Sequence, residues 1–168
     1  MLKLSNVLLI LTGTTTALMA GLFFAWSYSV TIGIARLPDS GYIASFQAMN
    51  RAIQNVVFLS CFMGTLLLLP LVTYMHYTPQ PSGRFWFLLA ASVLYGFGVF
   101  GVTMGFNVPM NEALDKFPLA TATADQIAAQ RAWFESRWNN LNMIRTVANT
   151  LAMACFIIAC LMPNSSQQ

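Results

Sequence analysis

The chain has 168 residues, of which 57% are hydrophobic and only 8% are charged. Soluble domains carry about 25% charged residues, so a chain this poor in charge could not cover its own surface in water. The net charge of +3 is small and dispersed, which excludes the strongly basic surface of a nucleic-acid-binding protein. Composition therefore predicts an integral membrane protein with no nucleic-acid partner.

Four stretches are apolar enough to cross a bilayer, because a spanning helix needs about 20 mostly apolar residues. They are residues 7–34, 56–74, 85–108 and 142–162. The first stretch continues past Ala20 to Trp26, which is too long for the core of a signal peptide. We therefore expect an all-α, integral membrane four-helix bundle that forms a single domain over residues 1–168. Such a multi-pass protein would lie in the cytoplasmic membrane if its source is a bacterium.

The connections between these stretches differ in length. The second and third stretches are joined by a short polar turn over residues 78–84, whose prolines and glycine prevent helix continuation. The two long connections share the other side of the membrane, and we expect each to carry a short extramembrane helix. One follows Pro38, and the other begins near Ala124, where Thr123 and Gln126 match a capping box. Lys and Arg are divided too evenly to decide which side faces the cytoplasm.

Small residues recur at intervals of four in two of the apolar stretches. Gly13, Ala17 and Gly21 lie in the first, and Gly101 and Gly105 in the third. Small residues at this spacing let the backbones of two membrane helices approach closely. We expect both sets to lie at contacts between helices.

Polar residues of the fourth stretch form one stripe. Trp138, Asn142, Arg145 and Asn149 are spaced four, three and four residues apart, so they lie on one face of a helix. Arg145 and Asn149 lie inside the apolar stretch, where an unpaired polar group costs a few kcal/mol. Their side chains should therefore face the interior of the bundle.

Amide side chains from two other segments are expected at the same membrane depth. Gln47 and Asn50 share a helix face ahead of the second stretch, and Asn107 and Asn111 flank a proline at the end of the third. In one interpretation these amides cap helix ends and satisfy Arg145. In the other, which we favour, the cluster binds a small lipophilic molecule, because an arginine inside a span is a candidate functional residue and ligand pockets combine apolar walls with a few convergent polar groups. The candidate substrate-binding residues are Gln47, Asn50, Asn111, Trp138 and Asn142.

The chemistry available to this cluster is narrow. It contains no histidine and no cysteine, so neither a metal site nor haem ligation is expected. Arg145 could stabilise an anion such as a phenolate or an enolate through charge-assisted hydrogen bonds. The nearby carboxylates are those of Asp39, Glu112 and Asp115.

Three motifs resemble those of one known family. They are the run Phe46–Asn55, the segment Asn107–Leu114 and the pattern of Trp133, Trp138, Asn142 and Arg145. Together, in this order, they resemble the DUF1772 family, also called anthrone oxygenase-like, whose members are small four-span membrane proteins. The resemblance covers nearly the whole chain.

The resemblance implies an oxidoreductase, a monooxygenase that needs no cofactor and oxidises an anthrone-like or quinone-like aromatic with O2. On this hypothesis Arg145 and Asn107 act on the anion, and Glu112 or a water molecule is the base. Asn50, Asn111 and Asn142 would orient the substrate, and Trp133 and Trp138 would stack on its rings. The alternative is a non-catalytic protein that binds a small lipophilic ligand or serves as a small subunit of a membrane complex. Whether it forms a homo-oligomer is left open.

Overall fold

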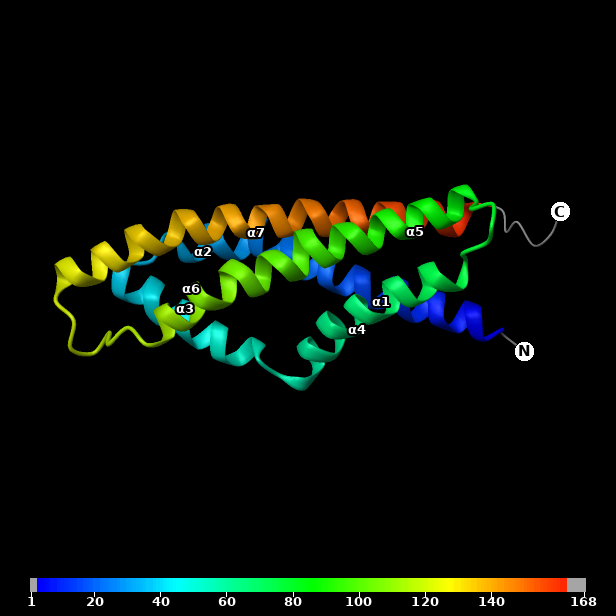
Figure 1. Cartoon of the computed structure of the whole chain (residues 1–168). Helices are drawn as coiled ribbons and strands as arrows, with labels where there is room; N and C mark the ends of the chain where they lie inside the picture. Colours follow the sequence, from blue (N-terminus) through cyan, green and yellow to red (C-terminus); the bar gives the residue numbers. More distant parts are fainter. Residues whose placement is uncertain (1–2, 163–168) are drawn as a thin grey trace.

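The computed structural model describes residues 3–162, which are helical apart from short connections. Four helices of this region are long and apolar enough to span a membrane. They lie lengthwise beside one another, with the start of the first span and the end of the fourth at the same end of the molecule (Figure 1). The prediction of an all-α, four-span membrane protein is therefore confirmed. The spans are Leu4–Ile34, Val56–Met75, Gly83–Asp115 and Ala124–Leu161.

Two of the spans contain π-helical turns. The first consists of α1 (Leu4–Ala25), η1 (Trp26–Val30) and α2 (Thr31–Ile34). The third consists of α5 (Gly83–Val93), η2 (Leu94–Gly101), η3 (Thr103–Asn107) and α6 (Val108–Asp115). The second span is α4 (Val56–Met75), and the fourth is α7 (Ala124–Leu161). π-helical turns are rare and occur frequently at functional sites.

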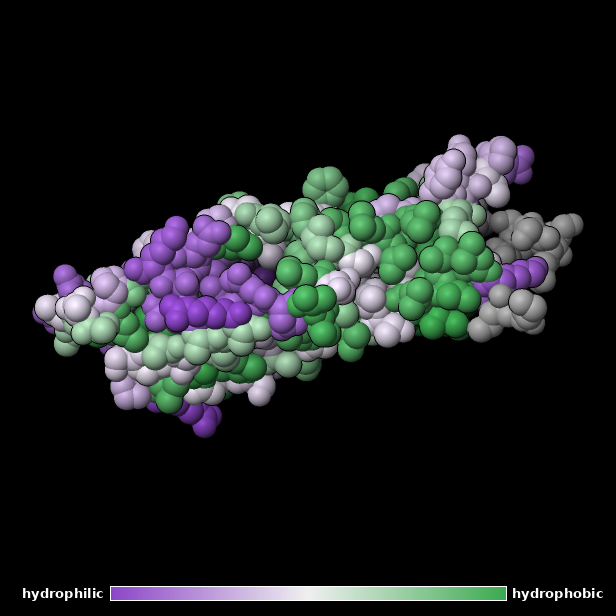
Figure 2. Space-filling view, turned by 90° about the horizontal axis from the view of Figure 1, so that it is seen from below, coloured by the Kyte–Doolittle hydropathy of each residue, from purple (hydrophilic) through white to green (hydrophobic). Residues whose placement is uncertain are grey.

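The spans form a closed ring of neighbours. α1 packs against α4 and α7, and α5 packs against the same two helices. Figure 2 shows hydrophobic side chains over the half of the bundle nearer the short turn, which we call the membrane half. Hydrophilic side chains gather at the end that carries the long loops. The bundle therefore has an apolar half and a polar, long-loop end.

The third and fourth spans extend beyond the predicted stretches. α7 is one continuous helix of 38 residues, so the expected separate helix near Ala124 and the fourth span are the same element. The sequence of α7 contains neither glycine nor proline, and nothing in it ends the helix between the two parts. The third span passes through Pro109 because the π-helical turn of η3 comes directly before it and accommodates the missing backbone donor. The capping box of Thr123 and Gln126 at the start of α7 is confirmed.

The first long loop carries the separate helix α3 (Asp39–Ile53), as predicted. After Ile53 the chain turns sharply, and Asn55 caps the next helix by accepting a hydrogen bond from the amide of Phe58. α3 and the start of α4 therefore form an elbow that bends away from α6 (Figure 1).

The small-residue prediction holds at one position and is wrong at three. A Cβ atom on Gly13 would lie 2.8 Å from the ring of Phe156, so this glycine allows a close contact between α1 and α7. A Cβ on Gly21 or Gly105 would meet nothing within 4 Å, and one on Gly101 would meet only its own helix. The close contact of the third span is made by Gly98 instead. A Cβ atom on Gly98 would lie 2.5 Å from the Cβ atom of Ala148 on α7.

Two hydrophobic clusters hold the bundle together. We call the larger the span core; it fills the membrane half and includes Met19, Phe62, Leu69, Leu88, Tyr95, Val99 and Phe156. We call the smaller the cap core; it lies at the long-loop end and consists of Tyr42, Ile43, Phe46, Leu114, Phe134 and Trp138, with other apolar residues packed against it. The polar cluster predicted from the sequence lies where the two cores meet.

Arg131 fastens the first long loop to α7. Its guanidinium forms ion pairs with Asp39 at 2.9 Å and Glu135 at 2.8 Å, and it donates to the carbonyl oxygens of Leu37 and Ala35. It also lies 4.6 Å from the ring centre of Tyr42. Burial, together with the nearby carboxylate of Glu135, raises the pKa of the Tyr42 hydroxyl above its ordinary value.

Candidate functional site

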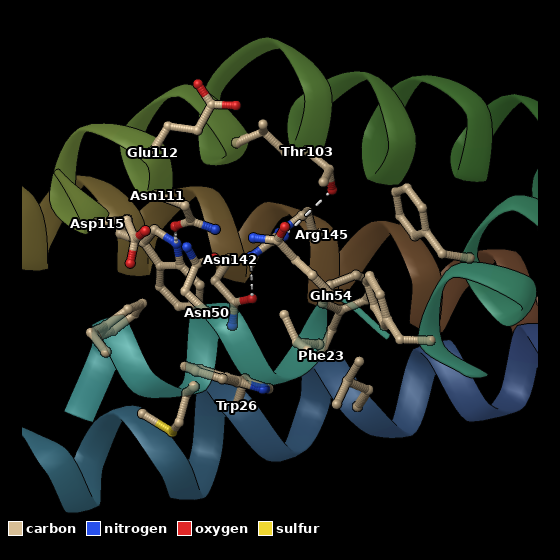
Figure 3. A pocket seen from close by; sticks show the side chains of 18 of the residues that line it. Phe23, Trp26, Asn50, Gln54, Thr103, Asn111, Glu112, Asp115, Asn142 and Arg145 are labelled. Carbon is tan, nitrogen blue, oxygen red and sulfur yellow. Dashed lines mark hydrogen bonds between the residues drawn. The ribbon is translucent and has the colours of Figure 1, made fainter. Parts of the chain in front are cut away.

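A cavity of about 450 Å³ lies at the long-loop end of the bundle, where α1, η1, α3, α4, η3, α6 and α7 meet (Figure 3). Its walls are mainly apolar and aromatic, with a few polar groups, as in most small-molecule sites. The aromatic lining residues are Phe23, Trp26, Phe46, Phe58, Phe62 and Trp138. The polar and charged ones are Asn50, Gln54, Thr103, Asn111, Glu112, Asp115, Lys116, Asn142 and Arg145.

Arg145 lies in the wall of this cavity and is only 5% exposed. Its Nη2 donates to Asn142 at 2.8 Å, its Nη1 makes a long contact of 3.4 Å with the hydroxyl of Thr103, and its Nε has no partner. Within residues 3–162 no carboxylate forms an ion pair with it. Its Cζ lies 4.7 Å and 5.2 Å from the ring centres of Phe23 and Trp138, which offset part of the charge. The guanidinium therefore keeps hydrogen-bonding capacity and positive charge for an anion in the cavity.

A chain of hydrogen bonds holds Arg145 in place. Asn142 accepts from the guanidinium and donates at 2.8 Å to the hydroxyl of Ser27. The hydroxyls of Ser27 and Thr146 are 2.7 Å apart, and that of Thr146 donates to the carbonyl oxygen of Phe23. The side-chain amide of Asn142 is thus engaged at both its oxygen and its nitrogen, and it links Arg145 to Ser27.

Trp138 sets the orientation of a second amide. Its indole N–H can only donate, and it donates at 2.8 Å to the side-chain oxygen of Asn111. The amide nitrogen of Asn111 is thereby turned away from the indole (Figure 3). The ring of Trp138 itself packs against Trp26 and Phe46 in the cap core. Asn111 thus presents hydrogen-bond donors to the cavity on a rigid aromatic support.

The outer part of the cavity carries charged groups. Asp115 is paired with Arg51 at 2.7 Å, which ties α6 to α3. Glu112, in contrast, forms no ion pair within the described part of the chain, and its carboxylate is turned away from Arg145 (Figure 3). Glu112 is therefore the free carboxylate of the lining.

Six of the eight residues predicted for the site line the cavity, and two do not. The lining residues are Asn50, Asn111, Glu112, Trp138, Asn142 and Arg145. Gln47 instead donates to the carbonyl oxygens of Leu114 and Phe117, where it caps the end of α6. Asn107 is fully buried beside the cavity, and neither atom of its amide has a partner among the described residues. The structure therefore gives Gln47 a capping position, whereas the role of Asn107 stays a prediction.

Sequence reasoning missed the contribution of the first span. The rings of Phe23 and Trp26 line the cavity. The hydroxyl of Ser27 accepts a hydrogen bond from Asn142 and so belongs to the chain that holds Arg145. The signal was the sequence Trp-Ser-Tyr-Ser at residues 26–29, which interrupts an otherwise apolar run and coincides with η1. Thr103, the other missed contact of Arg145, lies at the start of η3.

A second hollow of about 400 Å³ lies at the short-turn end, between α4 and the third span. The hydroxyls of Thr73 and Ser92, which lie in its lining, are 2.9 Å apart and bond to each other. No group of three or more His, Cys, Asp or Glu side chains within residues 3–162 is arranged to hold a metal ion.

The fold and the site define a four-span membrane protein with a buried guanidinium, which has no ion pair within the described residues, beside a mostly apolar cavity. A family model described as anthrone oxygenase matches residues 57–155, and the chain belongs to this family, also known as DUF1772. The match includes α4, the third span and most of α7, and hence Asn107, Asn111, Glu112 and Arg145. No curated protein and no solved structure matches the chain.

Proposed function

We propose that the protein oxidises a lipophilic anthrone-like or related phenolic aromatic with O2 inside this cavity. The observation that carries the proposal is the buried guanidinium of Arg145, which faces the cavity and has no carboxylate partner in the described chain. A buried charge is costly unless it is paired, so the site is suited to a ligand that carries an anionic oxygen. The cavity volume of about 450 Å³ lies in the usual range of ligand pockets.

The proposed chemistry uses only the substrate and O2. The methylene of an anthrone is acidic because its conjugate base is a phenolate-like enolate, and Arg145 would stabilise that oxygen anion. The enolate gives one electron to O2, and the resulting radical and superoxide combine into a peroxide at the former methylene carbon. The peroxide takes up the proton first removed from the methylene. Loss of the second proton from that carbon then cleaves the O–O bond and leaves a carbonyl and hydroxide, which takes up that proton to form water. The net reaction converts anthrone and O2 into anthraquinone and water.

The chain's residues would divide this work. Asn142 and Ser27 position Arg145, and Asn111 would donate to a second oxygen of the substrate. The aromatic rings of Trp26 and Trp138 would pack on the ring system. Glu112 is the candidate base, since Asp115 is already paired with Arg51. Because the Glu112 carboxylate is turned away in this conformation, it would act after a side-chain rotation or through a water molecule.

The direct test is oxidation of emodin anthrone by the purified protein, followed by the absorbance of the anthraquinone. We expect oxidation faster than in buffer alone, and a loss of about 10- to 100-fold for Arg145→Gln, because hydrogen bonds to charged groups contribute about 1.5–3 kcal/mol. Arg137→Gln is the matched control, since Arg137 is an exposed arginine of the same helix. Asn107→Ala, with the exposed Asn140→Ala as its control, tests the role predicted for Asn107. Conversion no faster than air oxidation would end the oxygenase proposal.

The orientation of Glu112 favours a second candidate, a protein that binds such an aromatic without transforming it. In that case emodin, the anthraquinone product, would bind and shift its visible absorbance as Arg145 stabilises its anion, while emodin anthrone would oxidise at the rate seen in buffer. The shift should be lost in Arg145→Gln. Binding together with turnover would rule out the second candidate.

A further inference from the structure

The lining of the cavity divides into a buried back wall and an exposed rim. Phe23, Trp138 and Arg145, which form the back wall, are nearly inaccessible. The exposed lining residues come from only two segments: the α3–α4 elbow and α4 on one side, and η3 and α6 on the other. They are Gln54, Leu59, Met104, Glu112 and Lys116. The opening of the cavity is therefore the gap between the elbow and the third span.

The rim is apolar at its membrane side and polar at its loop side. α4 has 20 residues, and at about 1.5 Å per residue it equals the thickness of a hydrocarbon core of about 30 Å. Leu59 therefore lies roughly one turn inside the hydrocarbon. Leu59 is 47% and Met104 49% exposed, and the adjacent Val56 and Val57 are 80% and 75% exposed. These side chains have no polar groups, so lipid is the environment that suits them.

The gap lies at the depth of the buried guanidinium. Leu59 and Arg145 are each about 16 residues from the short-turn end of their helices, which places both at roughly 24 Å from that end. A ligand that passed between Leu59 and Met104 would thus reach Arg145 by moving parallel to the membrane plane. It would not have to cross the charged, loop side of the rim.

Contacts between the two sides mark the upper and lower limits of the gap. On the loop side the ion pair of Arg51 and Asp115 ties α3 to α6. On the membrane side the hydroxyl of Tyr95 donates to the carbonyl oxygen of Phe62 at 2.9 Å, which ties η2 to α4. Between these two ties, within residues 3–162, no hydrogen bond or ion pair joins Leu59 or Met104 to the opposite side.

We propose that this gap is a lateral portal through which the ligand enters from the long-loop leaflet of the bilayer. The inference rests on the proposed function, because it concerns the same ligand and the same cavity. It adds a substrate class: aromatics that partition into lipid, including ones whose alkyl substituent is longer than the cavity and remains between Leu59 and Met104 in the bilayer. A rigid substituent of similar bulk that carries charge would be rejected at the apolar part of the rim.

The portal can be narrowed from its lipid side. Leu59→Trp and Met104→Trp place a larger side chain on the apolar rim. The matched controls are Leu67→Trp and Met75→Trp, which alter exposed apolar positions of α4 that do not line the cavity. Gln54→Trp narrows the polar part of the rim. Each variant is reconstituted in phosphatidylcholine nanodiscs, and binding of emodin is followed by stopped-flow visible absorbance, which the added tryptophans do not disturb.

We expect the apolar-rim variants to slow emodin association by about tenfold, because entry would require the new side chain to move aside, while both controls bind at the wild-type rate. Gln54→Trp should slow association less than either apolar-rim variant. For an emodin derivative with a dodecyl chain, the apolar-rim variants should also lose affinity, since its tail must occupy the gap. If Gln54→Trp slows binding and Leu59→Trp and Met104→Trp do not, the ligand enters from the aqueous side and the portal is wrong. If all variants bind at one rate, the portal is likewise wrong. Wild-type protein that does not bind emodin would overturn the proposed function itself.

Discussion

The two halves of this bundle treat their buried polar side chains in opposite ways. In the membrane half, Thr12, Thr16 and Thr73 each donate at 2.7 Å to the carbonyl oxygen four residues earlier in the same helix. At the long-loop end, the Nε of Arg145 and both amide atoms of Asn107 have no partner among the described residues. The amide of Asn149, beside Ala148 of the span core, also has none and is an exception in the membrane half. A hydroxyl can return its hydrogen bond to its own backbone, whereas an amide or a guanidinium has too many donors and acceptors to do so.

The contrast distinguishes bonded from unbonded polar residues of similar burial. The two hollows make the same point, because they are close in volume, at about 450 and 400 Å³. In the short-turn hollow the hydroxyls of Thr73 and Ser92 bond to each other, and no charged side chain lines it. In the other, Arg145 lies in the wall without a counter-ion in the described chain. The candidate site therefore differs from the short-turn hollow in its unpaired hydrogen-bonding groups, and not in its volume.

The largest effect on stability is expected from Arg131, which joins the first long loop to α7. Arg131→Ala removes two ion pairs and two hydrogen bonds to carbonyl oxygens, so we expect a loss of about 2–3 kcal/mol in the free energy of unfolding. Denaturant unfolding in detergent micelles would measure it. The control is Arg137→Ala, whose guanidinium bonds only to a carbonyl of its own helix and packs on Trp133. Equal stability of the two variants would show that the cap does not depend on Arg131.

The stability of the membrane half should depend on the volume of its packed side chains and not on their charge. Gly98→Val would push a side chain against Ala148, where even a Cβ would lie 2.5 Å from that of the alanine. Overpacking of this kind costs about 1–3 kcal/mol, and we expect the midpoint of thermal unfolding to fall accordingly. Gly105→Val is the matched control, because a Cβ at Gly105 meets nothing within 4 Å. A fall of similar size in both variants would refute the assigned contact between the third span and α7.

A pair of substitutions tests the comparison of satisfied and unsatisfied polar groups directly. Asn149→Leu removes an amide that is fully buried and has no partner in the described chain, so we expect the protein to gain about 1 kcal/mol. Thr16→Val removes a hydroxyl that is already bonded to Thr12, and its effect should be smaller and of the opposite sign. Both changes are read from the same denaturant titrations. Destabilisation by Asn149→Leu would mean that this amide has a structural role.

The smallest effect is expected from Ser27. Ser27→Ala removes the group that accepts from Asn142, so Arg145 would be held less firmly and emodin should bind roughly three- to tenfold more weakly. The stability of the unliganded protein should hardly change. Ser29→Ala, an exposed serine of the same π-helical turn, is the control. Unaltered affinity would remove Ser27 from the group of positioning residues.

Much of the fold could be predicted from the sequence, because apolar length decides where a helix crosses a membrane. The spacing of Trp138, Asn142 and Arg145 also placed them on one face correctly, since an α-helix fixes that geometry locally. The hydrogen-bond partners of Gln47 could not be predicted in this way. The carbonyl oxygens at the end of α6, to which Gln47 donates, come close to α3 only after the chain has folded.

The packing of the third span shows the same limit. The pair Gly101 and Gly105 has the spacing of a contact motif, yet η2 and η3 rotate the span, and Gly98 faces α7 instead. π-helical turns change the register between sequence and helix face, and the apolar sequence of the third span did not predict where η2 and η3 would form. The contribution of Ser27 was missed for a related reason, because it bonds to a residue more than a hundred positions away.

The most direct test of the account is Arg145→Met, measured for both stability and binding. Methionine fills a similar space without charge, so the unliganded protein should be at least as stable as the wild type, because a buried guanidinium without a carboxylate partner is lost. The same variant should bind emodin about 10- to 100-fold more weakly. If Arg145→Met instead destabilised the protein as much as Arg131→Ala and left the affinity for emodin intact, Arg145 would be a structural residue and the cavity would not be an anion-binding site.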